Sequence, residues 1–424
     1  MIYRVKAIAL DYRGYGVVKD LGKVGFIKGL LPGEEANIKI TTEKKKYFEG
    51  VIIELINKSK YRIETNDDYD NNSLSHLDNQ KQLTFQVDIT VETFLRNGFN
   101  DFKTKPIIYD QNYYNYRNKA LFHVINSPFI QLGGFRDGTK NFVEIDYLML
   151  ADELINDILK VLKKYYQENR VYFHDLKSIM IRSNSTEVMV IFITNTTTKI
   201  PELLYRPLLN DDRVISIYQN YQDIAHQNLG NQNIFHLKNE FITDKIGPLT
   251  FVIYPNSFFQ VNHNVTKLAY DYIKTLLKSD DVVIDAYAGM SSIGQYISSK
   301  VKQVYSIEND FDSIKSANES IKLNEIKNVE IVAGDFNKEF KNYRRIANTV
   351  IVDPPRSGLI TTTVESLNNS KIEKIIYMSC NLKTLVRDLK LLTNYTVIEV
   401  TPVKMFYQTV EIETIVYLEK NNEN

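Results

Sequence analysis

Short apolar segments alternate with amphipathic segments from Val282 onward, and this alternation is the feature that most restricts the fold of the chain. Strands are predicted at 282–284, 304–307, 329–333, 349–352 and 374–378, helices at 293–300 and 311–323, and two further strands at 395–400 and 411–418. Strands that are largely apolar and separated by helices are typical of a parallel sheet with helices on both faces. The sequence therefore predicts an α/β fold in which a ligand binds beyond the carboxyl ends of the strands.

The length and composition indicate a globular protein of more than one domain. The chain has 424 residues, more than one hydrophobic core usually serves, and 43% of them are hydrophobic and 25% charged. No apolar stretch approaches the roughly 18 residues needed to span a bilayer. Arg4 and Lys6 lie where a signal peptide would be apolar. We therefore expect a cytoplasmic protein that does not bind membranes, and nothing in the sequence predicts an obligate protein partner.

Residues 1–60 differ from the rest of the chain in charge. They contain 12 basic and 7 acidic side chains, although the whole chain is neutral, with 52 of each. Short β-type runs separated by turn signals, such as Leu31-Pro32-Gly33, predict a small β-barrel of the OB type. A basic barrel face binds nucleic acid in some proteins and is merely solvated in others, and the composition leaves both interpretations open.

Changes in composition divide the remainder. We predict a linker at 61–79, a central α+β domain at 80–245 and the α/β domain at 246–424. The linker is inferred from the acidic, Asn- and Ser-rich run at 66–73, which cannot bury enough apolar surface to form a core.

The central segment mixes both kinds of pattern. A helix is predicted at 150–166, strands at 179–182 and 188–194, and a hairpin turn at Asp137-Gly138. Several tyrosines and a phenylalanine lie close to Arg117 and Lys119. Such a group can hold single-stranded bases, and it can equally be part of a core.

A glycine-containing turn follows the first strand of the α/β domain. It runs from Asp285 to Gly294 and opens a helix, a place where a ligand can approach the backbone closely. Ser291 stands where a dinucleotide-binding G-x-G-x-x-G motif would have its second glycine, so a nicotinamide oxidoreductase is disfavoured. Glu308, at the end of the next strand, could hold a ribose diol or partner a helix N-terminus.

Two more strands end in residues that could carry chemistry. Asp353 precedes two prolines, which cannot join the sheet and would hold this carboxylate at the strand end. Cys380 follows the fifth strand, and a helix is predicted from about Thr384. The positive end of that helix dipole is expected to lower the pKa of the thiol, which favours a nucleophile over a buried apolar cysteine.

Metal and disulfide chemistry is not expected. Cys380 is the one cysteine of the chain, which excludes an intrachain disulfide and a zinc or iron–sulfur site with several cysteines. The six histidines show no ligand spacing, so no metal is predicted.

Several motifs that occur in one order resemble the S-adenosylmethionine-dependent RNA uracil-C5 methyltransferases. They are SFFQVN at 257–262, the Tyr287/Gly289 turn, DPPRSGL at 353–359, YMSCN at 377–381 and MFYQTVEIET at 405–414. The resemblance covers nearly the whole chain. Residues 1–60, with LPGE at 31–34, resemble the N-terminal TRAM barrel of the family, and YRNK at 116–119 resembles a run in its central domain.

The resemblance implies a Rossmann-like methyltransferase domain and roles for six residues. Gln260, Tyr287, Glu308 and Asp353 would contact S-adenosylmethionine, Cys380 would be the nucleophile that adds to uracil carbon 6, and Glu413 would be the base that removes the proton from carbon 5. The chain departs from the family at Ser291, where many members have glycine, and at Glu411, where histidine is frequent. Members with an iron–sulfur cluster carry a cysteine group that begins within the segment 62–82; this chain has none there and resembles the cluster-free branch.

The expected partner is structured RNA. We prefer 23S ribosomal RNA to transfer RNA, because an added TRAM-like barrel suggests a large folded substrate. Two alternatives remain from the sequence. One is a methyltransferase of adenine or guanine amino groups, which would have a proline-rich loop after strand four and need no cysteine. The other is a non-catalytic RNA-binding protein whose cofactor turn has decayed at Ser291.

Overall fold

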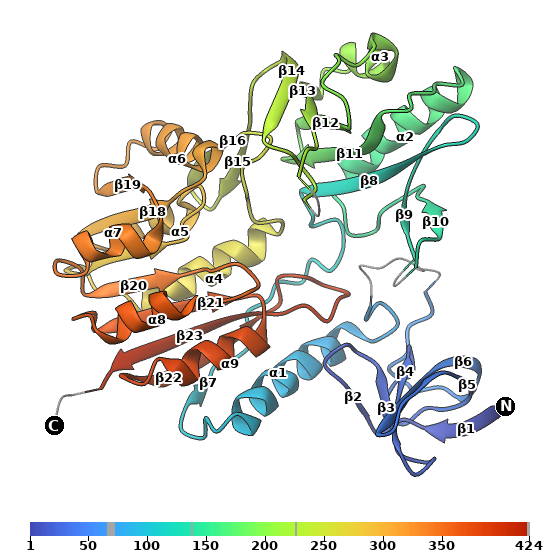
Figure 1. The fold of residues 1–424 in the computed structure, drawn as a ribbon, viewed down its shortest axis with the longest axis horizontal. Helices are drawn as coiled ribbons and strands as arrows, with labels where there is room; N and C mark the ends of the chain where they lie inside the picture. The colour runs from blue at the N-terminus through green and yellow to red at the C-terminus, as the bar shows by residue number, and fades with distance from the viewer. Residues whose placement is uncertain (66–72, 137–138, 225–226, 422–424) are drawn as a thin grey trace.

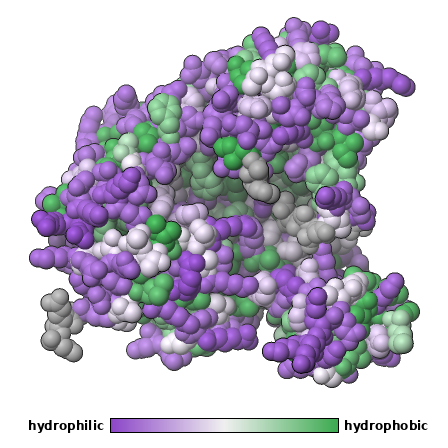
Figure 2. Space-filling view, viewed as in Figure 1, coloured by the Kyte–Doolittle hydropathy of each residue, from purple (hydrophilic) through white to green (hydrophobic). Residues whose placement is uncertain are grey.

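The computed structural model describes residues 1–65, 73–136, 139–224 and 227–421, which form an N-terminal barrel, a central sheet and a C-terminal sheet (Figure 1). Apolar side chains are scattered over a mostly polar surface, and the molecule is hollowed where the three parts meet (Figure 2).

The barrel is a curled sheet of six strands in the order β1-β5-β6-β4-β3-β2. Its strands are β1 (Ile2–Lys6), β2 (Ala9–Leu10), β3 (Gly16–Val18), β4 (Val24–Lys28), β5 (Glu35–Glu43) and β6 (Tyr47–Asn57). Alternate side chains such as Val5, Ile27 and Ile38 are buried, as expected for a sheet with one face on the core. A larger residue at position 25 would clash, because a Cβ atom at Gly25 would lie 2.2 Å from the ring of Phe48.

The central sheet has seven strands in the order β10-β9-β8-β11-β12-β13-β14. They are β8 (Lys119–Asn126), β9 (Ile130–Phe135), β10 (Phe142–Glu144), β11 (Leu176–Ser183), β12 (Val188–Thr194), β13 (Val214–Tyr221) and β14 (Gln232–Lys238). The amphipathic helix α2 (Glu153–Glu168), capped by Asp152, packs its apolar side against this sheet. The short helices η1 (Glu202–Leu204) and α3 (Arg206–Leu209) follow, and a hairpin of β15 (Ile242–Ile246) and β16 (Leu249–Ile253) leads into the C-terminal sheet.

The C-terminal sheet has eight strands in the order β19-β18-β17-β20-β21-β23-β22-β7. The strands are β7 (Lys103–Thr104), β17 (Val282–Ala286), β18 (Gln303–Glu308), β19 (Val329–Ala333), β20 (Thr349–Val352), β21 (Lys374–Ser379), β22 (Tyr395–Val403) and β23 (Glu413–Lys420). The first five in the spatial order are parallel, and β23 runs antiparallel between β21 and β22. Its helices are α4 (His263–Thr275), α5 (Ser292–Ile297), α6 (Phe311–Leu323), α7 (Phe336–Tyr343), α8 (Thr361–Asn368) and α9 (Leu382–Leu391).

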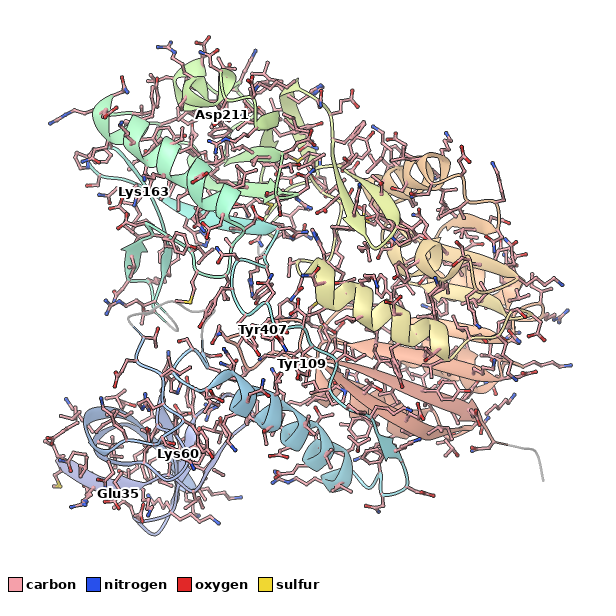
Figure 3. All side chains as sticks on the ribbon, turned by 180° about the vertical axis from the view of Figure 1, so that it is seen from behind. Glu35, Lys60, Tyr109, Lys163, Asp211 and Tyr407 are labelled. Carbon is pink, nitrogen blue, oxygen red and sulfur yellow. The ribbon has the colours of Figure 1, made fainter. Side chains whose placement is uncertain are left out.

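An N-terminal segment completes this C-terminal sheet. Helix α1 (Asn79–Arg96) lies between the barrel and the C-terminal sheet and packs against α9, and Phe94 enters the core of the C-terminal sheet (Figure 1). Strand β7 (Lys103–Thr104) then pairs with β22 at the sheet edge. Tyr109 and Tyr407 lie at the junction between the central and C-terminal parts (Figure 3).

The predicted α/β sheet is present, and several elements coincide with their predicted bounds. These are the strands at 188–194, 329–333 and 349–352 and the helix at 311–323. The predicted helix at 293–300 is shorter, since α5 ends at Ile297, and the last strand begins at Glu413 instead of Glu411.

Some predictions remain predictions. The hairpin turn at Asp137-Gly138 and most of the acidic run, 66–72, lie outside the described residues. The predicted domain boundaries also stay predictions. Most of α1 and all of β7 fall within the predicted central segment, but both elements contact the C-terminal sheet. Among the described residues, no helix is both long enough and apolar enough to cross a bilayer.

Candidate active site

The parallel strands end level with one another, which gathers the loops that follow them. Ala286 of β17 lies beside Ile307 of β18 and Val352 of β20, and Val352 lies beside Tyr377 of β21. The predicted site residues Tyr287, Glu308, Asp353 and Cys380 follow or end these strands, so they occupy one edge of the sheet, as the sequence predicts.

The turn after β17 has an unusual backbone. Tyr287, Gly289 and Ser291 have φ angles of 58°, 54° and 58°, in the left-handed region that is costly for residues with a Cβ atom. Nothing lies within 4 Å of the position that a Cβ of Gly289 would take, so the main chain is open to a ligand there. Ser291 is fully buried, and its hydroxyl is 2.7 Å from that of Ser306 on β18.

Glu308 is held at the end of β18 by main-chain donors. Its Oε2 accepts a hydrogen bond of 2.7 Å from the N–H of Gly289, and its Oε1 accepts 2.8 Å bonds from the N–H groups of Asn309 and Asp310. The glycine turn and this carboxylate are therefore one rigid unit. The half-buried carboxylate retains lone pairs for a diol, which fits the ribose of a nucleoside.

The buried side chain of Asp285 supports the glycine turn, a role that the sequence did not predict. The side chain is buried and accepts hydrogen bonds of 3.1 Å from Gly294 N–H and from the Ser306 hydroxyl. Burial raises the pKa of its carboxyl to about 7. A carboxyl at the last but one position of a strand, just before a glycine turn, is the signal that could have identified it.

Tyr287 and Asp353 lie on the other side of the turn. The Tyr287 ring packs on Phe336 with ring centroids 5.5 Å apart, and its hydroxyl is 3.3 Å from Thr363 Oγ1. Asp353 follows β20 directly, and burial raises the pKa of its carboxyl to about 7. Beyond the two prolines, Arg356 forms an ion pair with Glu411.

Cys380 and Glu413 are brought together by strand register. Ser379 of β21 lies opposite Thr414 of β23 in the last pair of the antiparallel ladder, so Cys380, which follows Ser379, and Glu413, which precedes Thr414, lie at the same end of the two strands. The expectation of a lowered thiol pKa is wrong for this structure. Burial, and then repulsion by Glu413, raises the pKa of Cys380 to about 11, against an opposing effect of Arg356. At the N-terminus of α9, the Asn381 side chain accepts a hydrogen bond from the Lys383 N–H and caps the helix.

The carboxyl of Glu413 is buried and incompletely satisfied. Only 6% of the residue is exposed, and its Oε2 has no hydrogen-bond partner. Burial and the nearby charge of Asp353 raise the pKa of this carboxyl well above its usual range. Glu411, two residues earlier, differs in both respects, because its side chain is 38% exposed and is paired with Arg356.

Gln260 is buried on the loop between β16 and α4, which links the central and C-terminal parts. Its carbonyl accepts a 3.1 Å hydrogen bond from the Asn118 amide, which joins the SFFQVN and YRNK motifs. Arg182 fixes the same loop through the carbonyls of Pro255 and Ser257. Of the six predicted site residues, five lie at the carboxyl-end edge of the parallel strands, and Gln260 lies on this separate loop. The loop contacts the C-terminal part through the Ser257 hydroxyl, 2.6 Å from Ser316 Oγ of α6.

Basic side chains lie around this loop. The Lys119 ammonium is 5.8 Å from the centre of the exposed Phe258 ring, and Arg117 lies over the ring of Phe406. Burial, together with the charges of Arg182 and Arg117, lowers the pKa of Lys119 to about 7. Among the described residues, no three His, Cys, Asp or Glu side chains are grouped so that they could hold a metal ion.

Helix α1 holds the loop that leads to Glu413, a role that the sequence reasoning missed. Gln82 donates to Gln408 Oε1 at 2.8 Å and accepts from the Gln408 N–H at 3.1 Å. Gln86 donates to the carbonyls of Thr409 and Glu411. Both glutamines are fully buried, where polar side chains need hydrogen-bond partners, and no local pattern in the sequence signals these contacts.

Comparisons with known proteins agree with this arrangement. Residues 79–421 match the model of the family described as tRNA (Uracil-5-)-methyltransferase. The relatives include proteins named as uncharacterized RNA methyltransferases, one from Fusobacterium nucleatum (31% identical, 99% of this chain and 96% of that protein) and one from Bacillus cereus (32% identical, 96% of this chain and 95% of that protein).

A solved structure shows the same fold. It is the Pyrococcus abyssi tRNA (uracil-54, C5)-methyltransferase in complex with S-adenosyl-L-homocysteine, with a TM-score of 0.80, 24% identity, and coverage of 98% of this chain and 99% of that one. The predicted mixed α/β methyltransferase fold is thereby confirmed. The match to this family argues against both alternatives from the sequence, the methyltransferase of adenine or guanine amino groups and the non-catalytic RNA-binding protein. The chain thus belongs to the tRNA (uracil-5-)-methyltransferase family and is an S-adenosylmethionine-dependent RNA (uracil-5-)-methyltransferase.

Proposed function

We propose that this enzyme methylates carbon 5 of a uridine through a covalent bond between Cys380 and uracil carbon 6, with Glu413 as the base. The observation that carries the proposal is the position of Cys380 directly after β21, beside a buried, unpartnered carboxyl, that of Glu413, at the start of the neighbouring antiparallel strand β23. A nucleophile and a base on adjacent strands can act on neighbouring atoms of one flat ring.

The cofactor would lie on the neighbouring part of the same edge. The open main chain at Gly289, the fixed carboxylate of Glu308 and the ring of Tyr287 fit a nucleoside, and Asp353 and Gln260 would complete the site toward the uracil. S-adenosylmethionine supplies the methyl group when bound. The chain's single cysteine supports an enzyme without an iron–sulfur cluster.

The residues of this chain would act in sequence on the uracil ring. The thiolate of Cys380 would bond to carbon 6, and the electrons of the carbon 5–carbon 6 double bond would move onto the carbonyl oxygen at carbon 4, which leaves an enolate whose carbon 5 is nucleophilic. After carbon 5 has gained the methyl group, Glu413 takes the proton from carbon 5. The resulting enolate expels the sulfur of Cys380 from carbon 6 and restores the double bond of the ring.

The environment of Glu413 suits this proton transfer. A carboxylate with a raised pKa is a stronger base than an exposed one, and general bases placed within hydrogen-bond reach contribute roughly 10²- to 10⁴-fold. Glu411 is less suited, because Arg356 neutralises it at the rim of the site. This difference supports the choice of Glu413 made from the resemblance.

We propose ribosomal RNA as the first candidate substrate, since a barrel beside the active site extends the surface available to a large folded RNA. Transfer RNA is the second candidate, and a specific observation favours it. The Pyrococcus abyssi protein is described as a tRNA methyltransferase. The match between the two structures covers 98% of this chain.

Two experiments test these proposals. RNA containing 5-fluorouridine should form a denaturation-resistant adduct with the enzyme, because fluorine at carbon 5 cannot be removed as a proton. Cys380→Ala should abolish the adduct, and Glu413→Gln should leave its formation largely intact while stopping turnover on normal RNA. An adduct that persists in Cys380→Ala would contradict the mechanism.

The substrate is identified by mass spectrometry of RNA from a deletion strain. Loss of a 5-methyluridine from ribosomal RNA supports the first candidate, and loss from transfer RNA alone supports the second. If both RNAs keep all of their 5-methyluridine, both substrate proposals fail.

A further inference from the structure

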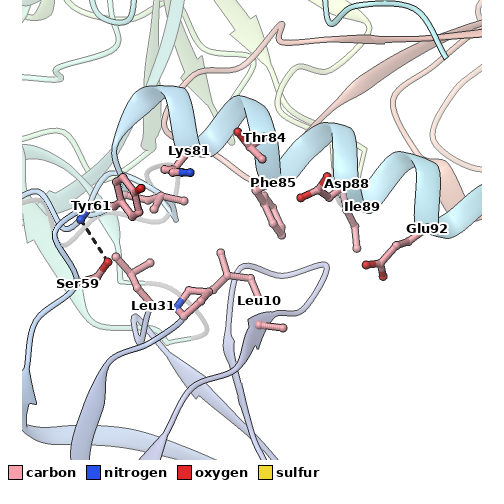
Figure 4. A pocket seen from close by; sticks show the side chains of 13 residues that line it. Leu10, Leu31, Ser59, Tyr61, Lys81, Thr84, Phe85, Asp88, Ile89 and Glu92 are labelled. Atoms are coloured by element: carbon pink, nitrogen blue, oxygen red, sulfur yellow. Dashed lines mark hydrogen bonds between the residues drawn. The ribbon is translucent and has the colours of Figure 1, made fainter.

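A continuous groove leads from the catalytic cysteine along the barrel, and we call it the barrel–α1 groove. Its larger part has a volume of about 1190 Å³ and extends from Cys380 to Tyr12, in the turn between β2 and β3 of the barrel, and to Phe26 of β4. Its smaller part, of about 350 Å³, continues along α1 to Tyr61 and Lys81 (Figure 4). The two parts share Leu10, Ile89 and Glu92, so they form one path.

Aromatic rings and cations alternate along this path. Tyr12 is 54% exposed, and the Lys383 ammonium lies 3.7 Å from its ring centre, three residues after Cys380. The Arg13 guanidinium lies 4.5 Å from the centre of the Tyr15 ring and 5.1 Å from that of Phe26. Stacking platforms beside cations are the usual means by which proteins hold unpaired nucleotides.

The second end of the groove repeats this arrangement. The Lys81 ammonium lies 4.4 Å from the centre of the Tyr61 ring, and Phe85 of α1 points into the space between α1 and the barrel (Figure 4). An apolar floor flanked by two cation–tyrosine pairs suits bases better than phosphates.

The charges of the groove also favour unpaired bases. Arg13 is paired with Asp11 and Glu49, and Arg96 with Glu92, so these acids and bases offset each other. A double helix presents its phosphates and needs a strongly positive surface, whereas unpaired bases can also be held through their faces by aromatic rings. Base amino groups can donate to carboxylates such as Asp88 and Glu92.

We propose that the barrel–α1 groove binds the unpaired nucleotides next to the target uridine, with the nearest base stacked on Tyr12 and a phosphate at Lys383. The proposal rests on the proposed function, because the uridine at Cys380 sets where the neighbouring nucleotides begin. The groove then selects uridines in loops over uridines in helices, since a paired neighbour cannot stack on Tyr12.

Substitutions at Tyr12 test the groove with total RNA from a strain that lacks the enzyme. Tyr12→Ala should raise the KM for this RNA roughly 5- to 150-fold, the range expected for one lost base–aromatic stack, and Tyr12→Phe should keep the KM within about twofold. Tyr172→Ala is the matched control, because Tyr172 is similarly exposed, at 56%, and lies in the central part of the chain. Equal KM values for Tyr12→Ala and Tyr172→Ala would overturn the proposal and leave the groove to another occupant.

A crosslink separates this proposal from the proposed function. An enzyme with benzoylphenylalanine at position 12 is first trapped on 5-fluorouridine RNA and then irradiated. We expect a crosslink to a nucleotide adjacent to the trapped uridine. An adduct without a crosslink refutes the groove alone, whereas the absence of any adduct refutes the proposed function and with it the groove.

Discussion

The side-chain amide of Gln86 donates a 2.8 Å hydrogen bond to the carbonyl oxygen of Glu411, a residue 325 positions further along the chain. The same amide lies 3.3 Å from the carbonyl of Thr409. A helix that belongs to the N-terminal half of the sequence therefore fixes the loop on which Glu413 depends.

Gln86→Leu should lower kcat strongly and lower the Tm only modestly. The change leaves the carbonyl of Glu411 without its donor, which costs about 1 to 3 kcal/mol, and it frees the loop that leads to Glu413. We expect kcat for methyl transfer to fall at least tenfold with a modest fall in Tm. Gln80→Leu, at an exposed position of the same helix, is the control, and an equal loss of activity there would contradict the positioning role.

Alkylation of Cys380 by iodoacetamide should accelerate with pH over a wide range. Because the pKa of the thiol is about 11, its thiolate fraction rises about tenfold per pH unit between pH 7 and 9. The chain's single cysteine allows the reaction to be followed by intact mass. A plateau below pH 9 would show that the helix dipole dominates after all.

Arg356→Gln should slow that alkylation severalfold at each pH from 7 to 9. The Arg356 guanidinium lowers the pKa of the Cys380 thiol, so its removal decreases the thiolate fraction. Arg345→Gln removes an exposed charge elsewhere on the C-terminal part and should have no effect. Faster alkylation of Arg356→Gln would contradict the assignment of charge around the thiol.

The free energy of unfolding of variants at position 291 should depend on how well each residue tolerates a left-handed backbone. Ser291 has a left-handed backbone, which costs about 1 to 2 kcal/mol, and a hydrogen bond to Ser306, which returns about 1 kcal/mol. Ser291→Gly removes both and should stay within about 1 kcal/mol of the parent. Ser291→Ala keeps the strain and loses the bond, so its free energy of unfolding in urea should be the lowest. Equal stability of the Ala and Gly variants would refute the strain.

Lys404→Met should stabilise the protein at neutral pH and impair its activity. Lys404 is fully buried, burial lowers its pKa to about 7, and its ammonium donates to the Thr409 carbonyl at 3.1 Å. A lowered lysine pKa costs stability as the pH falls from about 10.5 to 7, so the gain in Tm should be larger at pH 7 than at pH 10. A gain independent of pH would show that the lysine is not neutral when buried.

Local signals in the sequence predicted the elements of the C-terminal sheet well. The helix at 311–323 begins directly after Asp310, whose side chain caps it, and strands such as 349–352 are buried on both faces and read as uninterrupted apolar runs. Placement of the candidate residues at one edge followed from the parallel order alone.

The chemistry of the site was harder to predict, because it depends on what surrounds each group. The sequence places Cys380 near a helix, but only the fold shows that the thiol is buried and that Glu413 and Asp353 approach it, which together raise its pKa. Nor does any local pattern reveal that the amides of Gln82 and Gln86 meet a loop more than 300 positions away.

The parallel pair of β7 and β22 has a consequence for synthesis on the ribosome. β7 leaves the ribosome when most of the C-terminal sheet has not yet been made, and β22 follows only near the last strands. Domains usually fold in the order of their synthesis. Here β7 and α1 stay exposed until β22 and α9, with which they pack, have been synthesised. A translation arrest just before residue 395 would therefore leave a chain that contains every strand of the barrel and of the central sheet and lacks Glu413, the proposed base.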